Sequence, residues 1–303
     1  MVYPGENESV NTDSTEEVAM PPVADRVEVT ASHWRVIQPT KGWAPLRLGQ
    51  LWRYRELLYF LAWRDIKVRY KQTALGAAWA VLQPVLTMAI FTVIFGHVVG
   101  VKSDGVPYPL FVFCALIPWQ LFSYALTQSS NSLVESANLI SKVAFPRLVI
   151  PIAATLAGLL DFAISFFVLV LLLIAYHRAP DGAVLLLPLL VVLAMGTALA
   201  VGIWLSALNV QYRDVRYTIP FLAQIWLFVT PVAYPLSLAH GALRVVLALN
   251  PMTGVIDGFR YALLGTGQLD LLSIALSSSV TILALLGALY YFRRMEQTFA
   301  DVV

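Results

Sequence analysis

A chain of 303 residues in which 59% are hydrophobic and 13% are charged is too apolar for a water-soluble protein. Soluble domains contain roughly 45–50% apolar and about 25% charged residues, so the composition indicates an integral membrane protein. The formal net charge of +2 carries little information, because in membrane proteins the position of the basic residues matters more than their total. The single cysteine, Cys114, excludes a disulfide within the chain.

Residues 1–40 are expected to form a disordered acidic tail, because they are rich in Glu, Ser, Thr and Asn and contain a Pro-Pro pair. The tail lacks the basic start and the apolar core of a cleaved secretory signal. We therefore expect the membrane spans themselves to direct insertion.

Residues 41–71 are predicted to be cytoplasmic and to contain a helix that lies in the plane of the membrane interface. Aromatic and basic residues are interleaved along it, and its continuous apolar stretch, Leu57 to Trp63, is far shorter than the about 20 residues that cross a bilayer. A cytoplasmic helix packed on a soluble partner is the alternative. A basic cluster ends the region and marks the cytoplasmic edge of the membrane: Arg64, Lys67, Arg69 and Lys71.

Residues 72–303 are predicted to form a domain of six transmembrane helices, which makes the chain an all-α integral membrane protein. The six apolar segments are residues 75–97, 109–131, 148–176, 184–208, 218–236 and 271–292. The first is expected to be kinked or loosened near Pro84, because proline removes a backbone donor.

The positive-inside rule supports a topology with both termini in the cytoplasm. In that topology most basic residues after residue 40 fall in cytoplasmic segments. The external segments hold only Lys102, Arg178, Arg244 and Arg260.

Residues 237–268 are predicted to form two half-length helices that enter the membrane from the outer side and return. The apolar run Leu243 to Leu249 is too short to cross, and Asn250 and Pro251 interrupt the chain directly after it. Such backbone is tolerated only where protein or water surrounds it. A surface loop with two amphipathic helices is the alternative.

No motif in the sequence predicts catalysis. There is no GxxxxGK[ST] nucleotide-binding loop, no HExxH motif, no paired-cysteine metal site and no Ser/His/Asp grouping. We expect no catalytic residue, metal or cofactor on this chain, so the energy for transport must come from a partner or an ion gradient. Asp161 alone lies deep in a predicted span. It is either a coupling or substrate-contact carboxylate or a buried polar group satisfied by a neighbouring helix.

Two predicted spans combine aromatic rings with polar groups along one helical face. The residues are Trp79, Gln83 and Thr87 in the first span, and Tyr217, Phe221, Gln224, Phe228, Pro231 and Pro235 in the fifth. Aromatic rings can pack against the C–H faces of sugars while amides exchange hydrogen bonds with hydroxyl groups, which suits the passage of a glycan. Ordinary helix packing is the alternative.

Residues 136–147 are predicted to form a short amphipathic helix between the second and third spans, on the cytoplasmic side. Such a helix can press into a groove of a soluble partner and transmit its motion. Asn138, Lys142 and Arg147 are the side chains that the partner would contact. A simple connector is the alternative.

Five sequence segments in this order are similar to one known family. They are RDIKVRYKQTALGAAWAVLQP, IPWQLF, SANLISKVAFPR, LNVQYRDVRY and LNPMTGVIDGFR. Over roughly residues 50–295 the chain resembles the membrane-spanning subunit of bacterial type-2 ABC exporters, and in particular the branch that exports O-antigen, capsule and teichoic acid polysaccharides. The acidic tail lies outside this resemblance.

The resemblance implies a homodimer in the inner membrane, paired with two copies of a separate ATPase chain that binds ATP and Mg. The interfacial helix, with Arg64 and Lys67, and the coupling helix at about residues 134–146 would contact the ATPase. A lipid-linked polysaccharide would pass from the cytoplasm through a channel lined by the first and fifth spans. Membrane lipids would surround the complex, and no nucleic acid is expected as a partner. The two mixed faces described above would then be channel walls.

Three other functions remain open from the sequence. A type-2 ABC exporter of drugs or lipids would have the same fold. An ion-coupled secondary transporter would need more carboxylates inside the spans and inverted repeats. A membrane enzyme acting on lipid-linked sugars would need clustered acidic residues or a His/Asp/Arg site at the interface. The loop with Arg213, Asp214 and Arg216 is the single candidate, and ion-paired loop charges are the alternative.

Overall fold

The computed structural model describes residues 48–71, 76–180, 182–212, 214–266, 271–296 and Phe299, and every regular element in this part of the chain is a helix. The predicted all-α class is therefore confirmed. The predicted acidic tail, residues 1–40, lies outside the described residues. Before the first span, the described residues form α1 (Leu48–Arg53) and α2 (Arg55–Lys71).

Five helical stretches in the described residues are long and apolar enough to cross a membrane. They are α3 (Gly76–Phe91) with the π-helix η1 (Thr92–Val98), α4 (Tyr108–Glu135), α6 (Val149–Leu156) with α7 (Gly158–Ala175), the 3-10 helix η2 (Gly182–Leu186) with α8 (Leu187–Gln211), and α12 (Leu271–Met295). These stretches correspond to five of the six predicted spans. Between α4 and α6 lies the short α5 (Ala137–Lys142).

The kink or loosening near Pro84 stays a prediction, and the first span changes its helix type further along. Pro84 lies inside α3 and does not end it. The helix instead widens at Thr92, where the backbone N–H of Val99 bonds to the carbonyl of Ile94 at 2.9 Å, five residues back. This i→i+5 pattern is that of a π-helix, which is rare and frequently found at functional sites.

The fifth predicted span, residues 218–236, is shorter than expected. The helix α9 (Val215–Val229) has 15 residues, fewer than the about 20 that cross a bilayer. It ends because Thr230 adopts extended backbone before Pro231, and a residue before proline avoids the helical region. Pro231 and Pro235 are therefore not on the helical face of Phe221, contrary to the prediction. The 3-10 helix η3 (Leu236–Leu238) follows.

The predicted pair of half-length helices is present as α10 (Ala242–Leu249) and α11 (Pro251–Leu264), which meet at 93°. Asn250 forms the corner: its side-chain oxygen accepts from the backbone N–H of Met252 at 3.1 Å and caps α11. Pro251 occupies the first helical turn, where no backbone donor is needed.

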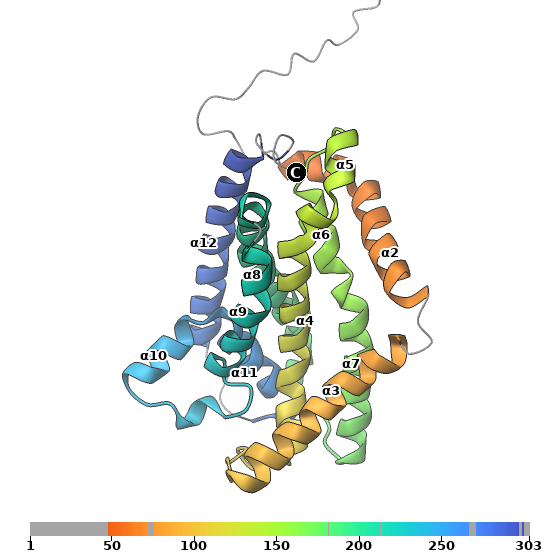
Figure 1. Ribbon diagram of the computed structural model, residues 1–303. Coiled ribbons are helices and arrows are strands. Elements are labelled where there is room, and N and C mark those ends of the chain that lie inside the picture. Colours follow the sequence, from red (N-terminus) through yellow and green to blue (C-terminus); the bar gives the residue numbers. More distant parts are fainter. Residues whose placement is uncertain are drawn as a thin grey trace, which may run out of the picture. The chain divides into compact units, whose positions relative to one another are not determined.

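The helix α4 is the centre of the bundle. It contacts α3, α6, α7, α8, α9 and α11, and Figure 1 shows these helices grouped around it, with α3 running obliquely across it. Its apolar window is 78% buried, whereas that of the first span is only 6% buried. One copy of the chain therefore provides a packed core around α4 and leaves α3 largely uncovered.

Small residues bring α11 close to its neighbours. A Cβ atom added to Gly254 would lie 2.5 Å from the hydroxyl of Ser277 on α12, so that no larger residue fits there without a shift. Close packing of small residues is a common way for helices to associate in membranes. The broken pair α10–α11 is thus fixed to the bundle through α11.

A buried arginine holds the chain that follows α9. The guanidinium of Arg260 on α11 donates to the carbonyls of Pro231 at 2.8 Å, Val232 at 2.6 Å and Tyr234 at 3.3 Å, and it lies 3.6 Å from the ring centre of Phe111. Arg260 is only 2% exposed. It is therefore not a surface charge of a loop between spans, as its place in the sequence suggested.

Three further hydrogen bonds hold the end of α9 and the turn that follows it. The Trp226 ring N–H donates to the Asn250 side-chain oxygen at 2.9 Å, and the Asn250 amide donates to the hydroxyl of Thr230 at 2.9 Å. The Tyr108 hydroxyl donates to the Ala233 carbonyl at 2.8 Å. Side chains from α4 and α11 thus supply donors where α9 stops.

Replacing Arg260 with Met is expected to destabilise the protein by about 2 kcal/mol or more, because three buried carbonyls lose their donor. Arg260→Lys should be intermediate, since an ammonium group lacks the planar fork that reaches several carbonyls at once. The apparent melting temperature of the purified protein measures both effects. Arg244→Met, at an exposed position on α10, is the control. An unchanged melting temperature for Arg260→Met would contradict the anchoring role.

Candidate functional site

The mixed face predicted on the fifth span is uncovered in one copy of the chain. Phe221 is 65% exposed and Phe228 is 59% exposed, and Gln224 between them is exposed as well. The opposite side of α9 is turned to the bundle, where Ile219 and Ala223 are buried. An amide facing lipid is unfavourable, so we expect this face to meet water or another polar group.

The mixed face of the first span is divided by the structure. Trp79 is 55% exposed, whereas Gln83 and Thr87 line a cavity of about 500 Å³ between α3, α4 and α7, which we call the span cavity. From α9 only Leu227 reaches this cavity. The two faces predicted to line one channel therefore do not meet in the described part of a single copy.

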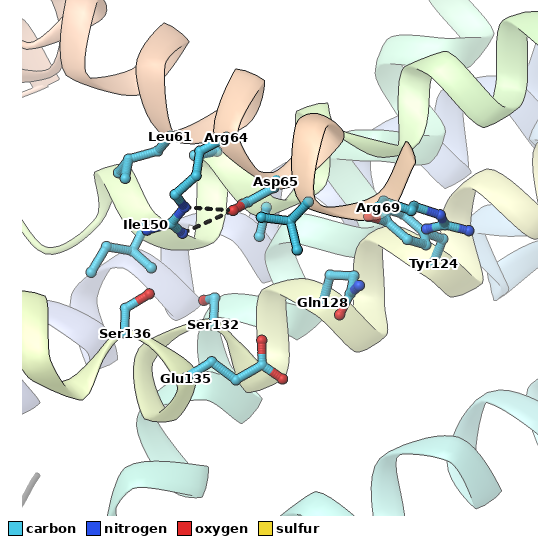
Figure 2. Close-up of a pocket in the computed structure, with 13 residues that line it drawn as sticks. Leu61, Arg64, Asp65, Arg69, Tyr124, Gln128, Ser132, Glu135, Ser136 and Ile150 are labelled. Atoms are coloured by element: carbon cyan, nitrogen blue, oxygen red, sulfur yellow. Dashed lines mark hydrogen bonds and ion pairs between the residues drawn. The ribbon is translucent and has the colours of Figure 1, made fainter. Parts of the chain in front are cut away.

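A second cavity, of about 590 Å³, lies between α2, α4 and α6, and we call it the α2 cavity. Figure 2 shows Arg64 and Asp65 of α2 paired at its wall, with an ion-pair distance of 2.8 Å, and Arg69 beside Tyr124 at one end. Arg69, Tyr124 and Gln128 line both cavities. These three side chains therefore stand between the two spaces.

Asp161 is paired with the end of α2. The Arg69 guanidinium lies 2.7 Å from its carboxylate, and the Tyr70 hydroxyl donates to it. Asp161 lies roughly 18 Å along the span that starts at Val149, at about 1.5 Å rise per residue. The end of α2 therefore reaches the middle of the third span. Of the two interpretations of Asp161, this contact fits a polar group satisfied by a neighbouring helix.

Two features support this contact. The Arg69 guanidinium lies 4.6 Å from the ring centre of Tyr124, and that ring lies against Gly158, where an added Cβ atom would be 2.5 Å from it. Burial, and then the hydrogen bond to Asp161, raise the pKa of the Tyr70 hydroxyl, so that it stays protonated and able to donate at neutral pH. Sequence reasoning missed the pair because Arg69 belongs to a basic cluster that topology alone explains.

The predicted partner-contact residues have different surroundings. Asn138 and Lys142 on α5 are exposed, and so are Arg64 and Lys67 on α2. Arg147 is half-buried: its backbone N–H lies 3.2 Å from the Glu296 carboxylate, and its guanidinium donates to the Glu296 carbonyl and lies 5.9 Å from the ring centre of Phe299. Arg147 thus ties the start of α6 to the end of α12.

The surface of α1 and α2 is unusually aromatic. Trp52, Tyr59, Phe60 and Trp63 are between 47% and 74% exposed. Large rings on a helix that also carries exposed basic residues are typical of a membrane-interface helix. The position of residues 41–71 in the plane of the interface stays a prediction.

The chain was compared with known proteins. The family model for ABC-2 type transporters matches residues 56–264. An O-antigen export system permease protein of Myxococcus xanthus is 30% identical over 257 residues, which cover 84% of this chain and 98% of the relative. A Klebsiella pneumoniae protein of the same name is 29% identical over 250 residues, 82% of this chain and 95% of the relative.

A more distant relative has a related description. The polysialic acid transport protein KpsM of Escherichia coli is 24% identical over 243 residues, 77% of this chain and 91% of the relative. The family match runs from α2 through α11 and includes α9 and both cavities. This chain is a member of the ABC-2 type transporter family.

Proposed function

We propose that this chain is the membrane-spanning subunit of an ATP-driven exporter that carries a lipid-linked polysaccharide from the cytoplasm across the inner membrane. The observation behind the proposal is the similarity to O-antigen export permeases over 98% and 95% of their lengths. The aromatic and amide side chains left uncovered on α3 and α9 agree with a sugar polymer as cargo. Drugs and lipids offer fewer hydroxyl groups for Gln83 and Gln224 to bond.

The functional unit in this proposal contains two copies of the chain. The first span is 6% buried in one copy, and α9 exposes the face of Phe221, Gln224 and Phe228. A second copy that faces α3 and α9 would shield these surfaces from lipid. It would also enclose a path between the copies, with the rings and amides as its walls.

Energy comes from a separate ATPase chain that binds ATP and Mg. Its contact surface is the end of the bundle that holds α5, and we assign this end to the cytoplasm because of its basic residues. The exposed side chains Asn138 and Lys142 on α5, with Arg64 and Lys67 on α2, form that surface. Arg147 acts within the chain rather than at the surface.

The helix α4 provides a direct route for the transmission of force. It runs for 28 residues, continues into α5 after Ser136, and contacts both α3 and α9. Closure of the ATPase subunits would press on α5 and shift α4 against these two helices. Polysaccharide can in turn stimulate ATP hydrolysis only if it binds the two conformations differently.

Alanine at Phe221, Gln224 and Phe228 together is expected to lower export roughly thirtyfold or more, because two ring contacts worth about 1 kcal/mol each are lost with a hydrogen-bonding amide. Surface polysaccharide of a deletion strain that carries the variant measures export. Phe167→Ala, on an equally exposed ring of α7, is the control and should export normally. Normal export by the triple variant would remove the α9 face from the path.

Lys142→Glu and Arg147→Glu are expected to have different effects on export and on stability. Lys142→Glu should lower export and ATP hydrolysis while the melting temperature stays unchanged, because Lys142 is exposed. Arg147→Glu should lower the melting temperature, because it places a carboxylate beside Glu296. Export assays and thermal unfolding of both variants check this. Full export by Lys142→Glu would exclude α5 as the coupling surface.

A further inference from the structure

The span cavity is lined by a polar stripe on α4. Gln120, Ser123, Tyr124, Thr127 and Gln128 line it at spacings of three, one, three and one residues, which is one face of a helix. Of the residues between them, Phe122, Ala125 and Leu126 are buried in the core, whereas Leu121 adds an apolar contact to the cavity wall. The stripe lies within the apolar span Tyr108–Glu135. A polar stripe at membrane depth is costly in lipid and indicates contact with water or a polar ligand.

The amides of this cavity have unused hydrogen-bonding capacity. The hydroxyls of Thr87 and Thr127 bond to carbonyls of their own helices, both at 2.8 Å. In contrast, the side-chain amides of Gln83, Gln120 and Gln128 make no hydrogen bond within the part of the chain that the structure describes. Each amide offers two donors and an acceptor. Three such groups from α3 and α4 converge on one space.

The remaining lining selects the chemistry of a ligand. Aromatic rings of Trp119, Tyr124 and Phe162 contribute to the wall. The charged side chains at the cavity, Arg69 and Asp161, neutralise each other at 2.7 Å. A neutral wall of amides and rings suits uncharged sugars and offers no net positive charge for a phosphate. The volume of about 500 Å³ lies within the range of roughly 300–1,000 Å³ that ligand pockets occupy.

We propose that the span cavity binds uncharged sugar residues of the polysaccharide, with Gln120 and Gln128 of α4 and Gln83 of α3 as the hydrogen-bonding groups. This inference rests on the proposed function and extends it. The subsite lies inside each copy, between the first, second and third spans, and is separate from the exposed face of α9. Each copy therefore holds sugar residues beside the path between the copies.

Protection of a cysteine at Gln120 tests the site directly. Cys114 is the only cysteine of the chain and is fully buried, so Gln120→Cys provides one reactive thiol. The complex in lipid nanodiscs is treated with a small maleimide alone, with lipid-linked polysaccharide extracted from the producing cells, with the same polysaccharide released from its lipid, and with polyprenyl phosphate alone. Gln211→Cys, at an exposed position at the end of α8, is the control.

Both forms of the polysaccharide should slow the modification of Gln120→Cys severalfold, while polyprenyl phosphate alone has no effect and Gln211→Cys reacts at the same rate throughout. Protection by polyprenyl phosphate alone would mean that the cavity holds the lipid carrier, which overturns the proposal. A thiol at position 120 that never reacts would mean that the cavity is closed, with the same consequence.

A second measurement separates this site from the proposed function. The double variant Gln120→Ala/Gln128→Ala should need about tenfold more polysaccharide for half-maximal ATP hydrolysis, since two hydrogen bonds to the sugar are lost. Gln211→Ala should match the unmodified chain. Equal half-maximal concentrations would reject the subsite and leave the exporter assignment intact. If polysaccharide fails to stimulate ATP hydrolysis by the unmodified complex, both the proposed function and the subsite are rejected.

Discussion

The carbonyl groups of the turn after α9 need hydrogen-bond donors, and the structure of this end of the bundle depends on supplying them. The helix α9 has 15 residues, fewer than the about 20 that cross a bilayer, and the carbonyls of the turn that follows it need donors that lipid cannot supply. Arg260 of α11 donates to the carbonyls of Pro231 and Val232, and Tyr108 of α4 donates to that of Ala233. Asn250, at the corner before α11, adds a hydrogen bond from its amide to the hydroxyl of Thr230. The broken helix pair is therefore a support for α9 and holds its outer face of rings and amides in place.

The same helix α4 joins this anchored end to the opposite end of the bundle. At one end its Tyr108 bonds to the turn after α9, and at the other it leads into α5 with the exposed Lys142. Between the two ends it contacts α3 and presents the polar stripe from Gln120 to Gln128 to the span cavity. Arg69 and Asp161 connect α2 to the same region. A push on α5 thus acts on a helix that touches each part of the proposed path.

Local sequence patterns predicted most of the helices, but they could not predict contacts between residues that are far apart in the sequence. Apolar run lengths located the spans, and Asn250-Pro251 predicted the corner between α10 and α11. The proline at position 231 could also have predicted that α9 ends before Thr230. The residues on both sides are apolar, however, and this favoured one continuous span. Arg260 looked like a loop charge, and Arg69 and Arg147 looked like surface cations. Arg260, Arg69 and Arg147 have partners up to 29, 92 and 149 residues away, and no local signal links them. The glutamines of α4 have helical spacing as well, but they lack the regularly spaced aromatic rings that marked the faces of the first and fifth spans.

ATP hydrolysis by this chain together with its ATPase partner in lipid bilayers tests the central claim most directly. The rate is measured alone, with lipid-linked polysaccharide and with small hydrophobic drugs. Stimulation by the polysaccharide and not by the drugs is the expected result. The absence of a stable ATPase partner, or transport driven by an ion gradient instead of ATP, would contradict the assignment and direct attention to Asp161 as a coupling carboxylate.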